Sequence, residues 1–410
     1  MIDVLLPRTP DAGLDDLLAR LRAAPGRVPF DPAAMGFVEA VSHALLSDRT
    51  SGSAGALIAL GHWFRRANLS VLQERLAPNG SVGDTRAMRR GVVFHLAPAN
   101  VDTLPLYCWL LSLLCGNANI VRVSRRSVAQ LGAFFDRIAP ILREAEHSVL
   151  AQSSLILTYD HDEAVTERLS AHCDLRLIWG SDERVSQLRR VPLPALAADL
   201  VFPNRFSLAM IRADALLGLP EQGLKRLAEG FCRDVFVFDQ QACASPRALV
   251  WIGDDADRAR ARARFWPAVA AELEERFPAQ PALQVMDRLT TLFRLLEAQP
   301  GARAETPPGE LPTRVWMPHL GDEERRLHAG HGVLIELDRA DLREALSLLQ
   351  PSDQTIGYFG YEREEWLELL SWLPTHAADR LVPIGSALSF SPVWDGVDLV
   401  RAFTRTPFLV

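Results

Sequence analysis

The sequence predicts a protein of the α/β class, in which helices pack against mostly parallel sheets. Short apolar runs of four or five residues, typical of buried strands, alternate with longer segments whose apolar residues recur at helical spacing. This alternation indicates βαβ units. The composition agrees, because 48% hydrophobic and 23% charged residues are ordinary values for a large globular protein. A length of 410 residues corresponds to roughly two or three domains.

The first expected domain spans residues 1–210 and begins with a helical region. Apolar residues at helical spacing predict helices at residues 15–21, 37–46 and 61–69. Strands and helices alternate from residue 91 onward. The expected strands are residues 91–97, 120–123, 154–158 and 175–179. The expected helices are residues 104–115, 161–172 and 184–190, with a further helix that Ser124 could cap.

The second expected domain spans residues 211–375, and its first strand lies at residues 208–211. Its other expected strands are residues 235–238, 248–252 and 333–337. The expected helices are residues 221–231, 256–276 and 339–349, and the proline- and glycine-rich residues 297–313 are expected to form a loop. Residues 376–410 are expected to return to the first domain or to form an oligomer interface.

The apolar run at 235–238 leads to the residue of greatest chemical interest, Cys243. A strand that ends in a turn can hold a thiol rigidly and still leave it accessible, and Pro246 prevents a simple helical continuation. Attack by a cysteine requires the thiolate, so a nucleophilic Cys243 needs a lowered pKa. The alternative is that Cys243 is a small core residue, because free cysteines are commonly buried.

Several function classes are weakened by what the sequence lacks. Lys225 is the only lysine, and its surrounding sequence indicates a solvated helix, so a Schiff base to pyridoxal phosphate is disfavoured. The GxxxxGK[ST] phosphate loop, the GxSxG elbow and the HExxH zinc motif are all missing. A net charge of -7 argues against general nucleic-acid binding. The arginines of residues 258–264 follow three aspartates, which indicates a solvated helix start.

The spacing of the cysteines and the N-terminal residues indicate the cellular compartment of the protein. The five cysteines show neither a CxxC motif nor the spacing of a disulfide scaffold, so we expect reduced thiols and a cytoplasmic protein. The N-terminal residues lack a basic segment followed by an apolar core, so no signal peptide is expected. The longest apolar run, residues 104–115, is too short to span a bilayer.

Four motifs in order resemble those of the aldehyde dehydrogenase superfamily. Pro98-Ala-Asn100 resembles its Pro-x-Asn turn, and Gly116 to Ser124 resembles its Gly-Asn-x-x-x-x-Lys-Pro-Ser segment. Ile178 to Glu183 resembles its Phe-Thr-Gly-Ser-x-Glu turn, and Phe238 to Cys243 resembles its nucleophile segment. The sequence of residues 97–103, 239–243 and 392–396 is most similar to that of the LuxC-like fatty acyl-CoA reductases. The resemblance covers roughly residues 55–401.

This resemblance implies an aldehyde dehydrogenase-like fold, with a Rossmann-like cofactor domain and an α/β catalytic domain. It also implies an NADPH-dependent acyl-CoA reductase that forms an aldehyde through a covalent acyl-cysteine. Cys243 would attack the thioester carbonyl. The side chain of Asn100 and the backbone N–H of Cys243 would stabilise the oxyanion. The alternative role for Asn100 is that of a turn former.

The same resemblance implies the cofactor-binding residues. Arg122 stands where aldehyde dehydrogenases usually carry a lysine that contacts the adenosine ribose, and Pro98 and Ser124 belong to the matched motifs. Arg125 follows where many NAD-using members carry glutamate, and a guanidinium there favours NADPH; a solvated arginine is the alternative. Gly180 and Ser181 open a helix suited to a pyrophosphate, or form an ordinary N-cap.

Two departures from the superfamily pattern affect the expected chemistry. The glutamate that activates water in hydrolytic members should lie near residues 200–205, and none stands there. Its absence suits an acyl-enzyme that is reduced rather than hydrolysed. The superfamily's ribose-contacting glutamate is also missing near His328 and His331. A metal site at these histidines is disfavoured because no third ligand is apparent, and none is expected elsewhere.

Other functions remain open at this point. The same residues could oxidise an aldehyde to an acyl-CoA, or the chain could be a non-catalytic homologue that binds an acyl carrier or a synthetase. A third alternative is an acyltransferase that uses Cys243 without a dinucleotide. For the reductase, the expected substrate is an acyl-CoA or acyl-carrier thioester, and a synthetase or carrier protein is a candidate partner. We also expect a homo-oligomer, without nucleic acid or a membrane span.

Overall fold

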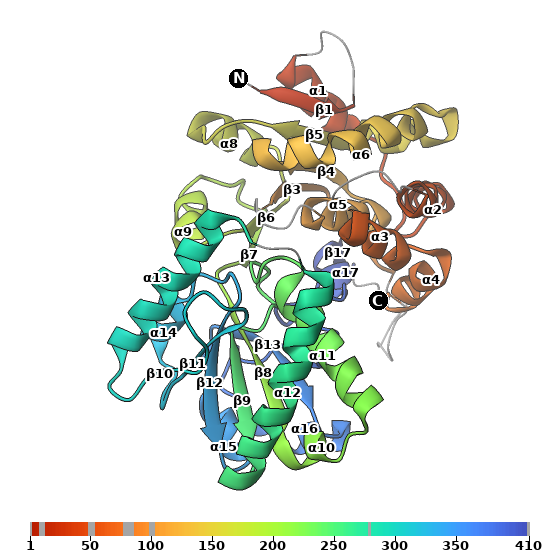
Figure 1. Ribbon diagram of the computed structural model, residues 1–410. Coiled ribbons are helices and arrows are strands. Elements are labelled where there is room, and N and C mark those ends of the chain that lie inside the picture. The colour runs from red at the N-terminus through yellow and green to blue at the C-terminus, as the bar shows by residue number, and fades with distance from the viewer. Residues whose placement is uncertain are drawn as a thin grey trace. The chain divides into compact units, whose positions relative to one another are not determined.

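The chain folds into two compact α/β units. The structure, a computed structural model, describes residues 2–7, 13–47, 54–76, 86–97, 103–277 and 280–407. Unit 1 consists of Met1–Pro203 together with Phe390–Val410, and unit 2 consists of Asn204–Ser389. Each unit has a central sheet with helices on its faces (Figure 1).

The sheet of unit 1 has six strands in the order β1-β5-β4-β3-β6-β7. All neighbours are parallel except β1 and β5. The parallel part of the sheet begins at β3, runs outward through β4 and β5, and then continues on the other side of β3 through β6 and β7. Parallel sheets of this order bind ligands at the carboxyl ends of their strands. The strands are β1 (Asp3–Leu6), β3 (Val92–Leu96), β4 (Ala118–Arg122), β5 (Ser154–Thr158), β6 (Leu175–Trp179) and β7 (Ala198–Phe202).

Helices cover both faces of this sheet. One apolar layer holds the sheet against α1 (Leu14–Ala23), α8 (Glu163–Ser170) and α9 (Asp182–Arg189). The opposite layer is larger. Its helices are α2 (Pro32–Leu46), α3 (Ala54–Trp63), α4 (Arg66–Glu74), α5 (Leu104–Leu114), α6 (Arg125–Arg143), α7 (Ser148–Gln152) and, from the C-terminal segment, α17 (Leu399–Ala402). Every residue of α5 is buried, which explains its uninterrupted apolar sequence.

The sheet of unit 2 has seven strands in the order β10-β11-β12-β9-β8-β13-β14, and only the β10–β11 pair is antiparallel. Side chains alternate between its faces, as the pleat requires. On β9, Val250 packs into one core cluster and Trp251 into the other. The strands are β8 (Phe206–Arg212), β9 (Ala248–Ile252), β10 (Arg303–Ala304), β11 (Thr313–Trp316), β12 (Val333–Arg339), β13 (Asp353–Phe359) and β14 (Arg380–Pro383).

Helices again form a layer on each face. One layer contains α10 (Ala213–Leu217), α11 (Glu221–Phe236) and α12 (Asp255–Arg276). The other contains α13 (Ala282–Ala298), α14 (Asp322–Leu327), α15 (Leu342–Leu346) and α16 (Arg363–Leu369). The remaining strands form two short pairs in unit 1: β2 (Met88–Arg89) with β17 (Thr404–Arg405), and β15 (Val393–Trp394) with β16 (Val397–Asp398).

The strand expected at residues 235–238 is wrong. The helix expected at 221–231 continues through this run and ends at Phe236. Its buried side chains recur at helical spacing through the last turn: Leu224, Leu227, Ala228, Phe231, Cys232, Val235 and Phe236. A run of four apolar residues fits a strand or a helix equally well by itself, and here the longer periodic pattern decides. The helix expected at 61–69 is likewise two helices, which meet at residues 64–65.

The limits of the two units differ from the expected domain boundaries. Residue 210 lies inside β8, whose pairing with β9 and β13 places the whole strand in unit 2. Residue 375 precedes β14, which extends the same sheet through its pairing with β13. Of the expected C-terminal segment, residues up to Ser389 belong to unit 2, and those from Phe390 belong to unit 1.

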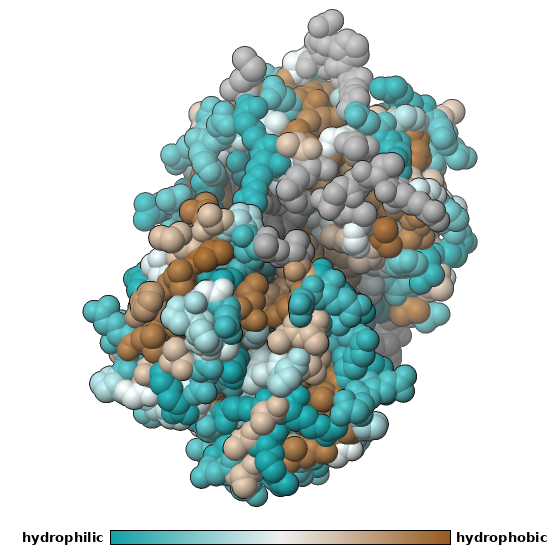
Figure 2. All heavy atoms as spheres, viewed as in Figure 1, coloured by the Kyte–Doolittle hydropathy of each residue, from teal (hydrophilic) through white to brown (hydrophobic). Residues whose placement is uncertain are grey.

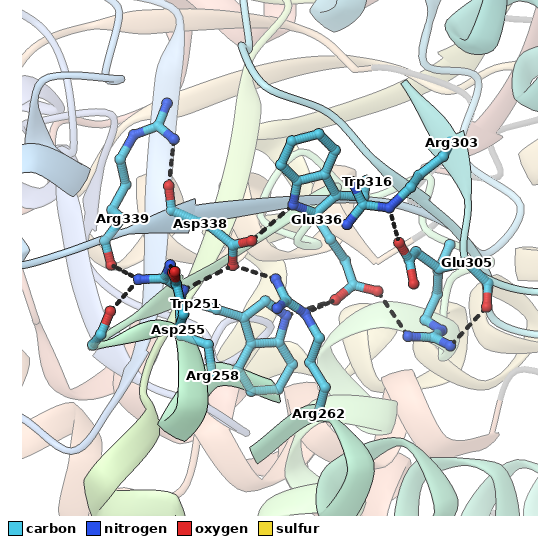
Figure 3. Close-up of polar contacts among 12 residues, drawn as sticks. Trp251, Asp255, Arg258, Arg262, Arg303, Glu305, Trp316, Glu336, Asp338 and Arg339 are labelled. Carbon is cyan, nitrogen blue, oxygen red and sulfur yellow. Dashed lines mark hydrogen bonds and ion pairs between the residues drawn. The ribbon is translucent and has the colours of Figure 1, made fainter. Parts of the chain in front are cut away.

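A network of charged side chains crosses unit 2 beside β12 (Figure 3). Glu336 is completely buried, and its carboxylate accepts hydrogen bonds from Arg262, Arg314 and the indole of Trp251. Its neighbour on the same face, Asp338, binds the guanidinium groups of Arg258 and Arg262 and the indole of Trp316. This network joins β9, β11 and β12 to α12.

The surface of unit 2 includes an apolar stripe on α13. Leu283, Met286 and Phe293 are exposed on this helix, whereas Leu292 and Leu295 face the core. Figure 2 shows hydrophobic residues along this part of the surface. No helix within the described ranges is both long and apolar enough to cross a membrane.

Candidate active site

Cys243 lies in unit 2, in a tight turn between α11 and β9. The backbone N–H of Ser245 donates to the carbonyl of Ala242 at 3.0 Å, which closes a turn with Cys243 at its first central position. The carbonyl of Cys243 accepts a hydrogen bond from the hydroxyl of Ser207 on β8 at 2.6 Å. The nucleophile candidate is therefore fixed to the sheet through its own backbone.

The loop before Cys243 is held by a buried glutamine. Gln240 is fully buried, and its side-chain nitrogen donates to the carbonyls of Pro246 at 2.7 Å and Val333 at 2.8 Å. Its side-chain oxygen accepts the N–H of Gly332 at 3.0 Å. Three backbone groups on both sides of the turn are thus satisfied by one amide, which restricts the path of the chain around Cys243.

A second set of contacts fixes Asp239, which has a left-handed backbone with φ of 50°. Its carboxylate contacts the Nδ1 of His331 at 2.5 Å and accepts a hydrogen bond from Gln280 at 2.7 Å. Gly332 lies beside this pair with φ of +83°, and a Cβ there would lie 2.5 Å from the side chain of Leu311. Only glycine fits that position without displacing its neighbours.

The sulfur of Cys243 has a polar neighbour that the sequence did not indicate. The side-chain nitrogen of Gln354, on β13, lies 3.5 Å from the sulfur. The oxygen of the same amide accepts a hydrogen bond from the hydroxyl of Thr355 at 3.4 Å, which orients the NH2 group toward Cys243. Gln354 is 111 residues away in sequence, and the pairing of β13 with β8 brings it close.

Exposure separates Cys243 from the other four cysteines. Cys243 is partly exposed, whereas Cys108, Cys115, Cys173 and Cys232 are buried. Burial raises the pKa of Cys173 and Cys232 to about 12, and it also raises the pKa of Cys108 and Cys115. These four thiols stay protonated at neutral pH and are inert core groups.

The two histidines near this loop have structural contacts. His328 is buried, its Nε2 faces the carbonyl of Val333 at 3.0 Å, and its Nδ1 accepts the N–H of Gly330 at 3.1 Å. Burial, and next the charge of Arg247, lower the pKa of His328 to about 3, so the ring is neutral. His331 is engaged by Asp239. Both rings thus stabilise the loop at residues 328–333 through these contacts.

The expected cofactor-binding residues lie in unit 1, at the carboxyl edge of its sheet. Arg122 ends β4, and Ser124 is the N-cap of α6, with its hydroxyl accepting the N–H of Ser127 at 3.0 Å. Gly180 follows β6, and Ser181 caps α9 by accepting the N–H of Arg184 at 3.3 Å. Parallel strand order brings these segments to one edge, which is where such sheets bind ligands.

Positive charge gathers at this edge. One nitrogen of Arg122 donates to the carbonyl of Tyr159 at 3.2 Å, while its Nε is buried without a hydrogen-bond partner. The charge of Arg184, then burial and then the charge of Arg122, lower the pKa of His161. Arg125 differs, because it forms ion pairs with Asp160 at 2.8 Å and Asp3 at 2.9 Å.

Two expected site residues cannot be placed. Asn100 and Pro98 lie outside the described residues. The structure therefore brings together Arg122, Ser124, Arg125, Gly180 and Ser181 in unit 1, and it describes Cys243 separately in unit 2.

Comparison with models of protein families identifies the family of this chain. The model of a family described as acyl-CoA reductase (LuxC) matches residues 70–292, which is more than half of the sequence.

The chain belongs to the LuxC family of acyl-CoA reductases. The match extends from the helical N-terminal region of unit 1 into α13 of unit 2, so it includes the Cys243 turn and all five described cofactor candidates.

Curated relatives agree with this family. A long-chain acyl-protein thioester reductase of Aliivibrio fischeri is 25% identical over 216 residues, which cover 52% of this chain and 40% of that protein. A long-chain acyl-protein thioester reductase 2 of Photobacterium leiognathi is 24% identical over 173 residues, covering 42% of this chain and 34% of that protein. The LuxC-family chain thus matches less than half the length of these relatives.

Solved structures show the fold. Aldehyde dehydrogenase 21 of Physcomitrella patens, in complex with succinate, is similar with a TM-score of 0.70 at 12% identity, over 96% of this chain and 89% of that one. A NAD-dependent aldehyde dehydrogenase of Sinorhizobium meliloti has a TM-score of 0.70 at 14% identity, over 97% and 87%. The expected aldehyde dehydrogenase-like α/β fold is confirmed.

Proposed function

We propose that this LuxC-family protein is an NADPH-dependent acyl thioester reductase that forms an aldehyde through a covalent acyl-Cys243. The observation that carries this proposal is the environment of Cys243. It is the one partly exposed cysteine, it lies in a tight turn fixed to the sheet, and an amide donor faces its sulfur. Membership of a family of acyl-CoA reductases indicates the class of reaction, which is reduction of an acyl thioester.

The thiolate of Cys243 attacks the carbonyl carbon of the thioester. The bond between that carbon and the departing sulfur breaks, and the released thiolate takes up a proton from water. During attack, the backbone N–H of Cys243 and the side chain of Asn100 donate hydrogen bonds to the carbonyl oxygen as it becomes negative. A bound NADPH supplies the hydride that converts the acyl group to the aldehyde and restores the free cysteine.

The residues at the carboxyl edge of unit 1 fit a phosphorylated dinucleotide. Arg122 has a buried Nε without a hydrogen-bond partner, and Arg184 adds a second positive charge close to it. A 2′-phosphate would satisfy such groups. Gly180 and Ser181 precede the N-terminus of α9, and Ser124 caps α6, so backbone N–H groups are available for the pyrophosphate. Pro98 is proposed to line the same site.

We propose a protein-bound or CoA-bound acyl group as the substrate. The named relatives are acyl-protein thioester reductases, which favours a carrier protein or an acyl-activating synthetase as the donor. CoA and carrier proteins present the acyl group on the same kind of thiol, so the chemistry at Cys243 is identical for both. A cytoplasmic location and a homo-oligomeric assembly belong to the same proposal.

The decisive experiment incubates the protein anaerobically with NADPH and a panel of acyl-CoAs and acyl-carrier proteins. The expected result is loss of NADPH absorbance with one aldehyde and one free thiol formed per NADPH consumed. Consumption of aldehyde with NADP⁺ and CoA, but no reduction of thioesters, would identify an enzyme of the oxidative direction. Thioester binding without turnover would contradict the proposal in favour of a non-catalytic homologue.

A further inference from the structure

A buried histidine faces two glutamates at the point in unit 1 where α6 ends. Glu144 is the C-cap of α6, and the short 3-10 helix η1 (Ala145–His147) follows before α7 begins. The N–H of His147 donates to the carbonyl of Glu144 at 2.9 Å, which closes the turn. The Nε2 of His147 lies 3.8 Å from a carboxylate oxygen of Glu144 and 3.6 Å from one of Glu146. One tight turn thus brings an imidazole and two carboxylates together.

The imidazole of His147 is held by the core, while the two glutamates face solvent. The side chain of His147 is only 5% exposed, whereas those of Glu144 and Glu146 are 57% and 75% exposed. The ring packs edge-on against Phe37 of α2, with ring centroids 5.4 Å apart. Among the described residues, the Nδ1 of His147 is buried without a hydrogen-bond partner. The ring therefore presents a fixed Nε2 to two carboxylates that a solute can reach.

The distances within this cluster suit a shared ion better than direct hydrogen bonds. Charge-assisted hydrogen bonds between nitrogen and oxygen span about 2.7–2.9 Å. Ligand atoms around a tetrahedral zinc ion lie about 3.3 Å apart, because each is about 2.0–2.1 Å from the metal. The measured 3.6 Å and 3.8 Å are closer to this second spacing, and one ligand atom from each residue lies within 4.8 Å of the other two. The exposed carboxylates can rotate to close the remaining gap.

The charges and the ligand types of the cluster favour a transition-metal cation. Two carboxylates that share a small volume repel each other, and a cation relieves this repulsion. Glu144 also caps the C-terminus of α6, where the helix dipole places partial negative charge. An imidazole nitrogen is a good ligand for Zn²⁺ and other divalent transition metals, whereas Mg²⁺ and Ca²⁺ prefer oxygen ligands. The buried imidazole therefore determines the class of ion.

We propose that Glu144, Glu146 and His147 bind a divalent transition-metal ion such as Zn²⁺, with water as the fourth ligand. The ligand atoms are the Nε2 of His147 and one carboxylate oxygen of each glutamate, and any proton on Nε2 passes to water on binding. The ion has a structural role, because it joins the end of α6 to α7 and, through the ring contact with Phe37, to α2.

This site is separate from the expected cofactor residues. Ser124 caps the opposite end of α6, and a helix of 19 residues is roughly 28 Å long. Zinc binding at Glu144, Glu146 and His147 is therefore independent of the proposed reductase activity.

The test measures Zn²⁺ binding to the full chain by isothermal titration calorimetry, after EDTA treatment and gel filtration. The protein carries Cys243→Ala throughout, because the partly exposed thiol of Cys243 is itself a potential zinc ligand. One Zn²⁺ should bind per chain. Glu144→Gln combined with Glu146→Gln should weaken binding about tenfold or more, since even the loss of a residue that only orients a metal ligand costs about 10–100-fold in affinity. His147→Gln should weaken binding to a similar extent.

A matched double variant separates the site from general surface charge. Glu163→Gln combined with Glu167→Gln removes two exposed carboxylates from α8 of the same unit and should leave the affinity unchanged. The variant of Glu144 and Glu146 alters only exposed side chains, so it tests the site even where His147→Gln does not fold. Hydrogen exchange gives a second readout. Zn²⁺ should slow the exchange of amides in residues 141–152, and this slowing should be lost in the variant of Glu144 and Glu146.

Three results would overturn the inference. Absence of Zn²⁺ binding would show that the cluster is only an ion pair between protonated His147 and the glutamates. Binding of unchanged affinity in the variants of Glu144, Glu146 and His147 would place the zinc elsewhere. Displacement of Zn²⁺ by an equal concentration of Mg²⁺ would indicate a carboxylate site without the imidazole. These measurements use neither thioester nor NADPH, so a failure of the reductase proposal leaves them intact.

Discussion

Exposure and polar surroundings distinguish Cys243 from every other thiol in this protein. The four buried cysteines have raised pKa values because a thiolate would be desolvated in their apolar surroundings. Cys243 instead is partly exposed and has an amide donor, that of Gln354, near its sulfur. At the residue scale, the environment rather than the residue type makes Cys243 the candidate nucleophile.

Replacement of Cys243 with alanine should abolish aldehyde formation, since no other accessible thiol can form the acyl-enzyme. The matched control is Cys232→Ala, which removes a buried thiol from α11 and should retain activity, with a loss of stability of about 1 kcal/mol. Wild-type protein given a thioester alone should also carry one acyl group on the Cys243 peptide by mass spectrometry. Full activity of the Cys243→Ala variant would refute the assignment.

Arg122 should determine the preference for NADPH over NADH. Arg122→Met should raise the KM for NADPH about tenfold or more and change that for NADH much less, because a charge-assisted contact contributes about 1.5–3 kcal/mol. Arg125→Met should have a smaller effect, since Asp3 and Asp160 already engage that side chain. Arg189→Met, at an exposed position of α9, serves as the control. Equal losses for both cofactors would exclude a 2′-phosphate contact.

At the scale of single elements, β12 and α11 carry acidic side chains into the interior. On β12, Glu336 is fully buried and balanced by two arginines and one indole (Figure 3). On α11, Asp234 is buried and accepts the backbone N–H groups of Gly385 at 2.5 Å and Ala387 at 3.0 Å. Each carboxylate ties its element to another segment of unit 2.

Glu336→Gln should destabilise unit 2 by about 3 kcal/mol, because it removes the fully buried counter-charge that the partly buried Arg262 and Arg314 share. The control is Glu305→Gln, which breaks the more exposed ion pair to Arg303 and should cost less than about 1 kcal/mol. Hydrogen exchange of β9 and β12 peptides measures the free energy of opening in this part of the sheet. Similar values for both variants would show that the buried network contributes no more than a surface pair.

The contact between α11 and the loop after β14 should depend on pH through Asp234. Burial raises the pKa of Asp234 to about 6 from 3.8, although the two backbone donors partly oppose this rise. A raised folded-state pKa means that the folded protein binds the proton more tightly. The group's stabilising contribution is therefore complete below about pH 4 and is lost as the pH rises through about 6.

Comparison with Asp234→Asn, which does not titrate, measures this contribution. The unfolding free energy of the wild type minus that of the variant should fall by about 2–3 kcal/mol between pH 4 and pH 7.5. Denaturant titrations at several pH values give this difference. A difference that stays constant across the range would show that the carboxyl group titrates normally.

At the scale of the whole molecule, the acyl-enzyme should resist water until reduction. The segment at residues 200–205 lacks the glutamate that activates water in hydrolytic relatives, and Ala198–Phe202 instead forms the edge strand β7 of unit 1. Without a positioned general base, attack by water on the acyl-cysteine is slow. The full chain should therefore separate acylation from release.

Thioester supplied without NADPH should release about one equivalent of free thiol per protein and then stop. Addition of NADPH should discharge the acyl group as aldehyde rather than carboxylic acid. The experiment quantifies thiol, acid and aldehyde over time with and without NADPH. Continuing release of acid in the absence of NADPH would show that another residue provides a base.

The sequence alone determined the α/β class, most strands and helices of unit 1, and Cys243 as the candidate nucleophile. These depend on local signals, namely periodicity, turn residues and ordered motifs. Tertiary structure decided the state of residues 235–238, because a short apolar run fits both helix and strand until its packing is known.

Tertiary structure also decided the partners of the charged and polar side chains. Gln354 reaches Cys243 across 111 residues through parallel strand pairing, and Arg125 meets Asp3 across 122 residues. Such contacts leave no trace in the sequence near either residue, because the pairing of distant strands brings them together. The reactivity of a side chain follows from those neighbours, so it is settled only when the sheet has formed.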